Sequence, residues 1–157
     1  MNRSQANSVF SSNVVPIPTA SARLMVFEPN HDWRYTVMKR LEQLVRLDCG
    51  WDGYSGQPVS LENATFALRM LEAVCGPDAI PPQLVPGSPG DLQIEWHTLA
   101  GDIELHVLAP NRVNAWRHLA GEDEDGESLD LTIDFGVVAI WVREITEADL
   151  AAAAAAA

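Results

Sequence analysis

The chain has 157 residues, of which 47% are hydrophobic, and a formal net charge of −12 at pH 7. This length suits one domain with a substantial core, and no run approaches the ~18 to 20 apolar residues of a membrane-spanning helix. Two cysteines are too few for a disulfide scaffold, so we expect a protein of the reducing cytoplasm.

The acidic excess is confined to the second half of the chain. Residues 1–76 contain seven acidic and seven basic residues, whereas residues 77–157 contain fifteen acidic residues and three arginines. A field of this sign repels phosphate, which disfavours direct binding of nucleic acid, and it attracts a basic partner. The charge therefore favours binding to a protein that has a basic surface.

The first segment, residues 1–22, is rich in Ser, Asn and Pro and is predicted to be a flexible arm. Its first twenty residues contain only Arg3 as a basic residue and no continuous apolar core, which argues against a secretory signal. A single α+β domain is predicted over residues 23–150, with a short edge strand at residues 23–27. The alanines at 151–157 are left out of functional inference.

Two amphipathic helices are predicted next. After Asn30, a potential cap, apolar residues recur at helical spacing at Trp33, Val37, Leu41, Leu44 and Val45. Ser60 is the expected cap of the second helix. The buried line of that helix would consist of Ala64, Ala67, Leu68, Leu71 and Val74. Gly76 and Pro77 would end it.

The segment that joins these helices, GWDGYSG at residues 50–56, has the composition of a shaped loop. Its glycines, which permit positive φ and close backbone approach, are Gly50, Gly53 and Gly56. Asp52 is suited to accept backbone N–H groups of its own loop. We expect Trp51 to plug the space between the helices, with partner recognition as the alternative, and for Tyr54 the two roles are evenly balanced.

Beyond Pro77 the apolar period changes from helical to alternating. Leu92, Ile94 and Trp96 alternate with polar residues, and Ile103 to Val107 repeat the pattern, which predicts a hairpin with Ala100-Gly101 as its turn. This register pairs Trp96 with Leu105, Ile94 with Val107, His97 with Glu104, and Glu95 with His106.

Further strands are predicted downstream. Val113 to Arg117 form a third strand, and Leu129, Leu131 and Ile133 alternate as a fourth. The apolar run Val137 to Val142 predicts a more buried strand. The acidic start of a last helix is predicted at Thr146, Glu147 and Asp149.

The predicted fold is therefore α+β, with two amphipathic helices packed on one face of a largely antiparallel sheet. That sheet is built from residues 82–143, and its opposite face is expected to be acidic.

The acidic segment from Gly121 to Glu127 is the main candidate for a partner contact. Its carboxylates belong to Glu122, Asp123, Glu124, Asp125 and Glu127. The segment fails the EF-hand pattern, because aligning Gly126 with the loop glycine puts Gly121 and Thr132 at ligand positions. No zinc-ligand spacing occurs either, so no metal and no cofactor is predicted. We predict that these carboxylates and Tyr54 contact a basic partner.

No catalytic constellation is evident along the chain. His97 and His106 fall on the exposed face of the predicted sheet, where cross-strand charge pairing explains them without catalysis. A nucleophilic Cys49 or Cys75 with a distant histidine stays open as an alternative. The tripeptide Asp134-Phe135-Gly136 matches the magnesium motif of kinases in letters only.

The combination of GWDGYSG, Pro58, an Ala/Leu-rich helix and Leu92-Gln93-Ile94-Glu95-Trp96 resembles a widespread family of small uncharacterised bacterial proteins. Its members have a GWDGYGA-x-P loop, a helix and an I-x-L-E-W type strand. The likeness covers residues 41–107, and Ser55-Gly56-Gln57 departs from the Gly-Ala pair that is usual there. The resemblance implies a bacterial or phage origin and a compact α+β domain, and it implies no activity.

From the charge and the lack of a catalytic constellation, we expect a non-enzymatic acidic factor that occupies a basic surface of a partner protein. Such a factor would act as an antitoxin, immunity or anti-defence inhibitor, with nucleic-acid mimicry as one form. Two alternatives stay open. One is a small cytoplasmic hydrolase with a Cys/His or His/carboxylate site, and the other is a structural subunit of a larger bacterial or phage assembly.

Overall fold

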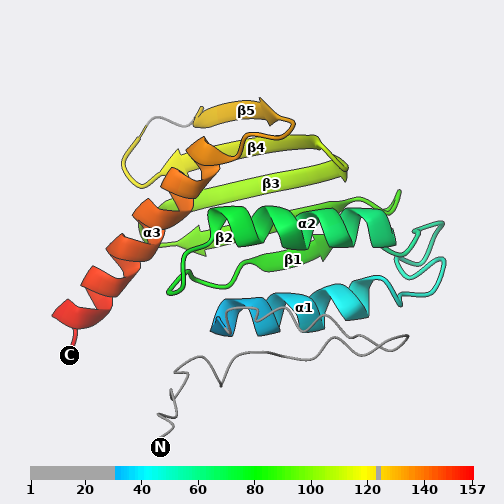
Figure 1. Cartoon of the computed structure of the whole chain (residues 1–157), viewed down its shortest axis with the longest axis horizontal. Helices are drawn as coiled ribbons and strands as arrows, with labels where there is room; N and C mark the ends of the chain where they lie inside the picture. The colour runs from blue at the N-terminus through cyan, green and yellow to red at the C-terminus, as the bar shows by residue number, and fades with distance from the viewer. Residues whose placement is uncertain (1–30, 123–124) are drawn as a thin grey trace, which may run out of the picture.

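The computed structural model describes residues 31–122 and 125–157 of the chain (Figure 1). The elements are α1 (Asp32–Leu44), α2 (Leu61–Val74), β1 (Gln83–Pro86), β2 (Leu92–Thr98), β3 (Gly101–Ala109), β4 (Arg112–Leu119), β5 (Glu127–Leu131) and α3 (Gly136–Ala155). The strands form one antiparallel sheet in the order β1-β2-β3-β4-β5. The predicted α+β class is confirmed, with three helices instead of two. The predicted arm at 1–22, the edge strand at 23–27 and Asn30 lie outside the described residues.

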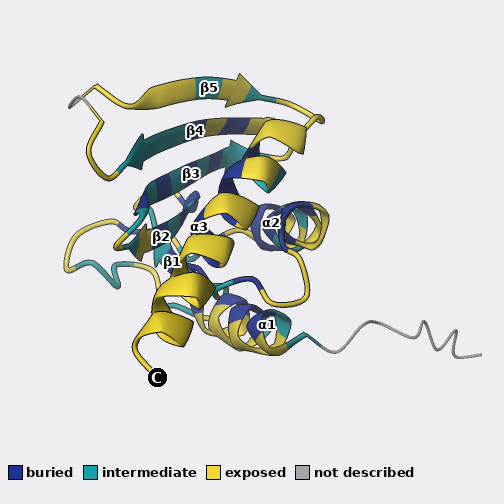
Figure 2. Cartoon of the chain, turned by 90° about the vertical axis from the view of Figure 1, so that its left-hand side faces the viewer, coloured by how far each residue is buried: buried dark blue, intermediate teal, exposed yellow. Residues whose placement is uncertain are grey.

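The three helices cover one face of the sheet (Figure 2), and the core lies between the two layers. Trp33 of α1, Trp96 of β2 and Trp141 of α3 are each only 2% exposed. The indole N–H of Trp33 donates to the Gly76 carbonyl at 3.0 Å and that of Trp96 to the Ile80 carbonyl at 2.8 Å. Large apolar rings are thus buried with these two polar edges satisfied.

Both predicted amphipathic helices form with the expected buried faces. In α1 the buried residues are Trp33, Val37, Leu41 and Leu44, as the spacing predicted, whereas Val45 is the C-cap and is only partly buried. Ser60 caps α2, because its hydroxyl accepts the backbone N–H of Asn63 at 3.1 Å. Leu68 is only partly buried, and Met70 takes a core position that was not predicted.

The β2–β3 hairpin forms, but its register differs from the prediction by two residues. Trp96 lies opposite Ile103 and Ile94 opposite Leu105. The turn residues are Leu99 and Ala100, because Gly101 is already a strand residue paired with β4. A Cβ on Gly101 would lie 2.4 Å from the carbonyl oxygen of His118, so this close pairing requires glycine.

The polar partners across this hairpin change with the register. Glu95 lies opposite Glu104, His97 opposite Asp102, and Gln93 opposite His106. Because the shift is by two residues, every side chain keeps its predicted face and only its partner changes.

The run Val137 to Val142 is helical, so the strand predicted there is wrong. It begins α3, where Asp134 accepts the backbone N–H of Gly136 at 2.9 Å. The buried residues Val138, Trp141, Val142 and Ile145 follow helical spacing along α3.

Three further predictions around α3 need correction. Thr146, Glu147 and Asp149 lie inside α3 and do not begin a separate helix. Ile133 follows β5 and is 78% exposed, so the predicted fourth strand ends at Leu131. The sheet accordingly spans residues 83–131 and not 82–143. None of the helices in the described part of the chain has the length and apolar character needed to cross a bilayer.

The second face of the sheet is left uncovered by the described elements (Figure 2). We define the open face as the alternate side chains of β2 to β5 that point away from the helices. They are Gln93, Glu95, His97, Asp102, Glu104, His106, Asn114, Trp116, His118, Ser128 and Asp130. Carboxylates and histidines dominate these positions, and the same alternation places one basic residue, Arg112 at the start of β4, on this face.

Candidate functional site

The GWDGYSG loop is held in one conformation by its own backbone. Gly50 and Gly53 have φ values of +81° and +84°, and the Gly50 N–H donates to the Gly56 carbonyl at 2.7 Å. Asp52 accepts the backbone N–H groups of Tyr54 and Gly56, both at 2.9 Å. These two N–H groups lower the pKa of Asp52. The prediction that Asp52 bonds within its own loop is confirmed.

The same loop is tied to the connection between β1 and β2. The Ser88 hydroxyl donates to Asp52 at 3.1 Å, and the Gln57 N–H donates to the Ser88 carbonyl at 2.8 Å. In the first turn of α2, the side-chain amide of Asn63 donates to the carbonyl of Gly90 in the same β1–β2 connection at 3.0 Å. The loop therefore anchors the start of α2 beside the sheet.

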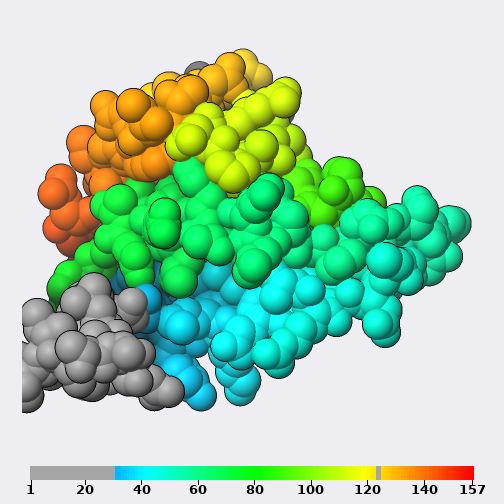
Figure 3. Space-filling model, turned by 45° about the vertical axis from the view of Figure 1, so that its right-hand side comes forward, coloured from blue at the N-terminus to red at the C-terminus, as the bar shows by residue number. Residues whose placement is uncertain are grey.

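Trp51 does not plug the space between the helices, so that expectation is wrong. Its indole is only partly buried and lies outside the core cluster. The indole N–H donates to the Gln57 carbonyl at 2.9 Å, so the side chain links the start of the loop to the residue that follows it. This loop projects from the molecule (Figure 3). Tyr54, at the loop tip, is 90% exposed.

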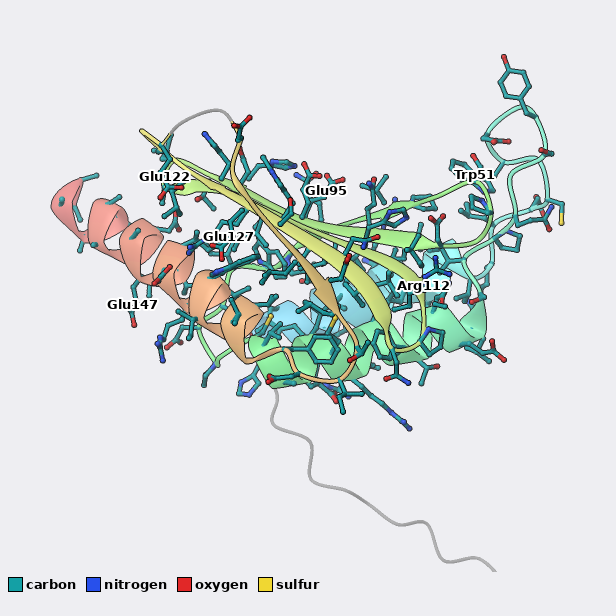
Figure 4. All side chains as sticks on the ribbon, turned by 90° about the horizontal axis from the view of Figure 1, so that it is seen from above. Trp51, Glu95, Arg112, Glu122, Glu127 and Glu147 are labelled. Carbon is teal, nitrogen blue, oxygen red and sulfur yellow. The ribbon has the colours of Figure 1, made fainter. Side chains whose placement is uncertain are left out.

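The acidic segment connects β4 to β5, and its carboxylates differ in their surroundings. Glu122 and Asp125 are exposed, whereas Asp123 and Glu124 lie outside the described residues. Figure 4 shows Glu122 and Trp51 at opposite ends of the sheet. The predicted partner-binding set, with Tyr54 in one loop and the acidic segment in the other, is thus not brought together.

Glu127 serves a structural ion pair on the helix side of the sheet. Its carboxylate pairs with the Arg117 guanidinium at 3.0 Å, and Glu144 of α3 pairs with the same guanidinium at 2.7 Å. The Arg117 guanidinium also lies 4.8 Å from the ring centroid of Trp141. These contacts link β4 and β5 to α3.

Neither cysteine forms the catalytic pair that the sequence left open. Cys75 is buried, and burial raises the pKa of its thiol to about 12. Cys49 is exposed, and its Sγ lies 3.6 Å from Oε1 of Gln57. Within residues 31–122 and 125–157, neither thiol is hydrogen-bonded to a histidine.

The open face contains a hollow of about 290 Å³. Side chains from β2 to β5 line it, chiefly Gln93, Glu104, His106, Asn114, Trp116, Ser128 and Asp130. In the view from above (Figure 4), Glu95 marks the side of the sheet that faces away from the helices. The hollow brings two carboxylates, an imidazole and an indole together at the centre of this uncovered face.

His106 is held by Asp91, a contact that the sequence did not predict. Asp91 immediately precedes β2, and its carboxylate is paired with Nε2 of His106. The other carboxylate oxygen of Asp91 is buried and has no hydrogen-bond partner among the described residues. A Cβ on Gly87 would lie 1.8 Å from that oxygen, so glycine makes room for the carboxylate. The sequence spacing could have predicted that Asp91 shares a face with His106, because Asp91, Gln93 and Glu95 are each two residues apart in an extended chain.

The other histidines of the open face also have partners. His97 lies 2.9 Å from an Asp102 oxygen and 3.2 Å from a Glu95 oxygen, and hydrogen bonds to these two carboxylates raise its pKa. The rings of His118 and Trp116 stack with their centroids 6.0 Å apart.

No group of three or more His, Cys, Asp or Glu residues able to hold a metal ion occurs in the described part of the chain. Comparison of the sequence and fold with protein-family models, curated proteins and solved structures found no match. The resemblance of residues 41–107 to a bacterial family therefore stays a prediction.

Proposed function

We propose that this protein is a non-enzymatic binding factor whose open face occupies a basic surface of a partner protein. The observation that carries the proposal is the acidic excess of the open face, because nearly all the described basic residues lie on the helix side of the molecule. Glu95, Asp102, Glu104 and Asp130 lie on the uncovered face, where alternation along β4 adds one basic residue, Arg112 at the first position of the strand. The other described basic residues lie elsewhere: Arg34, Lys39, Arg40, Arg46 and Arg69 on or next to α1 and α2, Arg117 on the helix side, and Arg143 on α3.

Like charges that face each other support the same proposal. Glu95 and Glu104 are directly opposite across β2 and β3. Such a pair destabilises a sheet, because two carboxylates repel at cross-strand distance. A cationic partner would remove that repulsion on binding, so the pair is better suited to a complex than to the free protein.

The expected partner is a protein that itself binds phosphate. A row of carboxylates on a sheet competes for a surface that attracts nucleic acid, which is how an antitoxin, immunity or anti-defence inhibitor would act. Direct binding of nucleic acid or of an anionic membrane is disfavoured by the same charge.

A pair of charge-matched variants tests the proposal. The first variant carries Glu95→Lys, Glu104→Lys and Asp130→Lys on the open face. The second carries Glu42→Lys, Glu62→Lys and Glu147→Lys on the helices, where all three side chains are exposed. Each immobilised protein captures partners from the native host, and the mass of each eluted complex is measured.

We expect the helix variant to retain the partners of the unmodified chain and the open-face variant to lose them. Equal loss in both variants would mean that net charge alone attracts the captured proteins, and retention by the open-face variant would place the interface elsewhere. The mass measurement also separates a reversible inhibitor from a subunit of a larger assembly, because a subunit elutes in a complex of fixed stoichiometry.

A hydrolase is the second candidate, and the Asp91–His106 pair favours it. A carboxylate that orients an imidazole is a recurring feature of histidine general-base sites. In the described residues His106 has no hydrogen bond to Ser, Thr or Cys, so the imidazole would have to activate water. Turnover of p-nitrophenyl acetate that falls at least about tenfold in His106→Ala, but not in His97→Ala, would favour this candidate over the binding factor.

A further inference from the structure

The hollow on the open face combines an indole with two carboxylates. We propose that it accepts the guanidinium side chain of an arginine from the partner. This inference deepens the proposed function, on which it rests, by naming the residue that would anchor the complex.

The first support is an aromatic wall that is fixed in place. Trp116 lines the hollow, and its ring stacks on His118 with the two planes 8° apart. The indole N–H reaches the Asp125 carbonyl at 3.4 Å. Gly126 has a φ of +61°, and a Cβ there would lie 2.7 Å from the indole nitrogen. The turn at Gly126 and the histidine thus hold the indole before any ligand arrives, as a preorganised contact requires.

The second support is an unpaired carboxylate beside that wall. Glu104 is directly opposite Trp116 across β3 and β4 and is half-buried in the hollow. Within the described residues it has no hydrogen bond or ion pair. Partial burial of a carboxylate reduces its hydrogen bonding to water, and a cation placed against it would replace those hydrogen bonds.

The third support is the set of further oxygen acceptors that line the hollow with Glu104. Asp130 uses one oxygen to accept the Asn114 amide. The side chains of Gln93 and Ser128 line the same hollow. Together these groups offer several oxygen acceptors around one central point, which suits a group that has many N–H donors.

Arginine fits this combination better than other ligands. Its guanidinium is planar and weakly hydrated, stacks on an indole, and can donate two parallel hydrogen bonds to one carboxylate. Lysine lacks the planar fork, and phosphate is repelled by Glu104 and Asp130. The volume of about 290 Å³ is at the lower limit for a small-molecule site, which also favours a single side chain.

Three small probes test the proposal on the full chain: Nα-acetyl-arginine amide, Nα-acetyl-lysine amide and the neutral isostere Nα-acetyl-citrulline amide. The readouts are the NMR shift of the Trp116 indole N–H and the dissociation constant from calorimetry. We expect saturable binding of the arginine probe, at least about tenfold tighter than the citrulline probe and tighter than the lysine probe.

Two variants locate the binding. Glu104→Gln should weaken the arginine probe about tenfold, because it removes the charged acceptor beside the indole. Asp102→Asn makes the same change in charge on the same strand, outside the hollow, and should leave the affinity within about twofold. Equal weakening by both variants would show diffuse attraction and overturn the proposal. So would a citrulline or lysine probe that binds as tightly as arginine, or no saturable shift of Trp116.

Failure of this inference differs from failure of the proposed function. Capture of basic partners that depends on the open face, without binding of the arginine probe, would leave the binding factor standing and remove the hollow from it. Binding of the probe in the hollow, with partner capture unaffected by the open-face variant, would show that the hollow accepts arginine and would remove the open face from the partner interface.

Discussion

At the scale of single residues, burial decides what a tryptophan contributes to stability. Trp51 and Trp96 both donate an indole N–H to a backbone carbonyl, but only Trp96 lies in the core, at 2% exposure. We predict that Trp96→Ala lowers the free energy of unfolding by about 3 to 5 kcal/mol through a core cavity. Trp51→Ala should cost about 1 kcal/mol, the value of one hydrogen bond. Urea unfolding measures the free energy of unfolding of both variants. Equal decreases would mean that Trp51 is buried in the core as Trp96 is.

His97 gives the stability a dependence on pH. Its pKa in the folded state is raised above the ordinary value of 6.5, first by Asp102 and then by Glu95. The protonated form therefore stabilises the native state fully below the unfolded pKa, and this stabilisation is lost as pH rises through the folded pKa. We predict that the stability difference between the unmodified chain and His97→Gln is larger at about pH 5.5 than at about pH 9. In an Asp102→Asn background that difference should shrink, whereas a difference that grows with pH would contradict the assignment.

Some residue contacts were predictable from the sequence and others were not. Asp52 bonds within its own loop as expected, because its partners are two and four residues away. The partner of His106 depends on the hairpin register, and a shift of two residues replaced the predicted Glu95 with Gln93 opposite it and left Asp91 as its ion-pair partner. Local chemistry fixes the first contact, whereas turn geometry fixes the second.

At the scale of elements, the hairpin shows how little separates one register from the next. Thr98 stabilises the turn at both ends, since its hydroxyl donates to the Gly101 carbonyl at 2.9 Å and accepts the Ala100 N–H at 3.2 Å. Alternation alone cannot distinguish registers that differ by two, because both place the same residues on the same faces. The sequence therefore predicted the open face correctly while its cross-strand pairs were wrong.

The last helix was mistaken for a strand because its first six residues are nearly all apolar. A short apolar run has no clear period, and β-branched valine and isoleucine favour a strand. Ile140 separates the two structures. In a strand it would share the buried face of Val138 and Val142, whereas in α3 it is 45% exposed.

We predict that Ile140→Lys changes the free energy of unfolding by no more than about 0.5 kcal/mol, as expected for an exposed helix position. Val142→Lys should instead remove most of the stability, because it places an unpaired charge in the core. Thermal unfolding of the two variants distinguishes them. Similar destabilisation by both would mean that this segment alternates as a strand.

At the scale of the whole molecule, the fold leaves the open face with an acidic excess and places nearly all the described basic residues on the helix side. The sequence places the acidic excess in residues 77–157 and favours the acidic loop over the sheet as the partner contact. In the structure Glu127 is paired with Arg117, whereas carboxylates of β2, β3 and β5 share the open face. Which carboxylates act together could not be predicted, because that depends on three-dimensional proximity between strands.

This arrangement predicts a variant that is more stable and less able to bind. Glu104→Lys replaces the like-charge pair with Glu95 by an opposite-charge pair, so it should raise the free energy of unfolding by about 0.5 kcal/mol. The gain should shrink in about 1 M NaCl, where exposed charges are screened. Glu42→Lys on α1 is the control, because it makes the same change in net charge away from the sheet. The measurements are urea unfolding at both salt concentrations and capture of the host partner. If Glu104→Lys is more stable and loses its partner while Glu42→Lys keeps it, the repulsion between Glu95 and Glu104 lowers stability at a site that is used for binding.

If Glu104→Lys is destabilised instead, the two carboxylates do not repel each other in the free protein, and the electrostatic basis of the proposed function is lost.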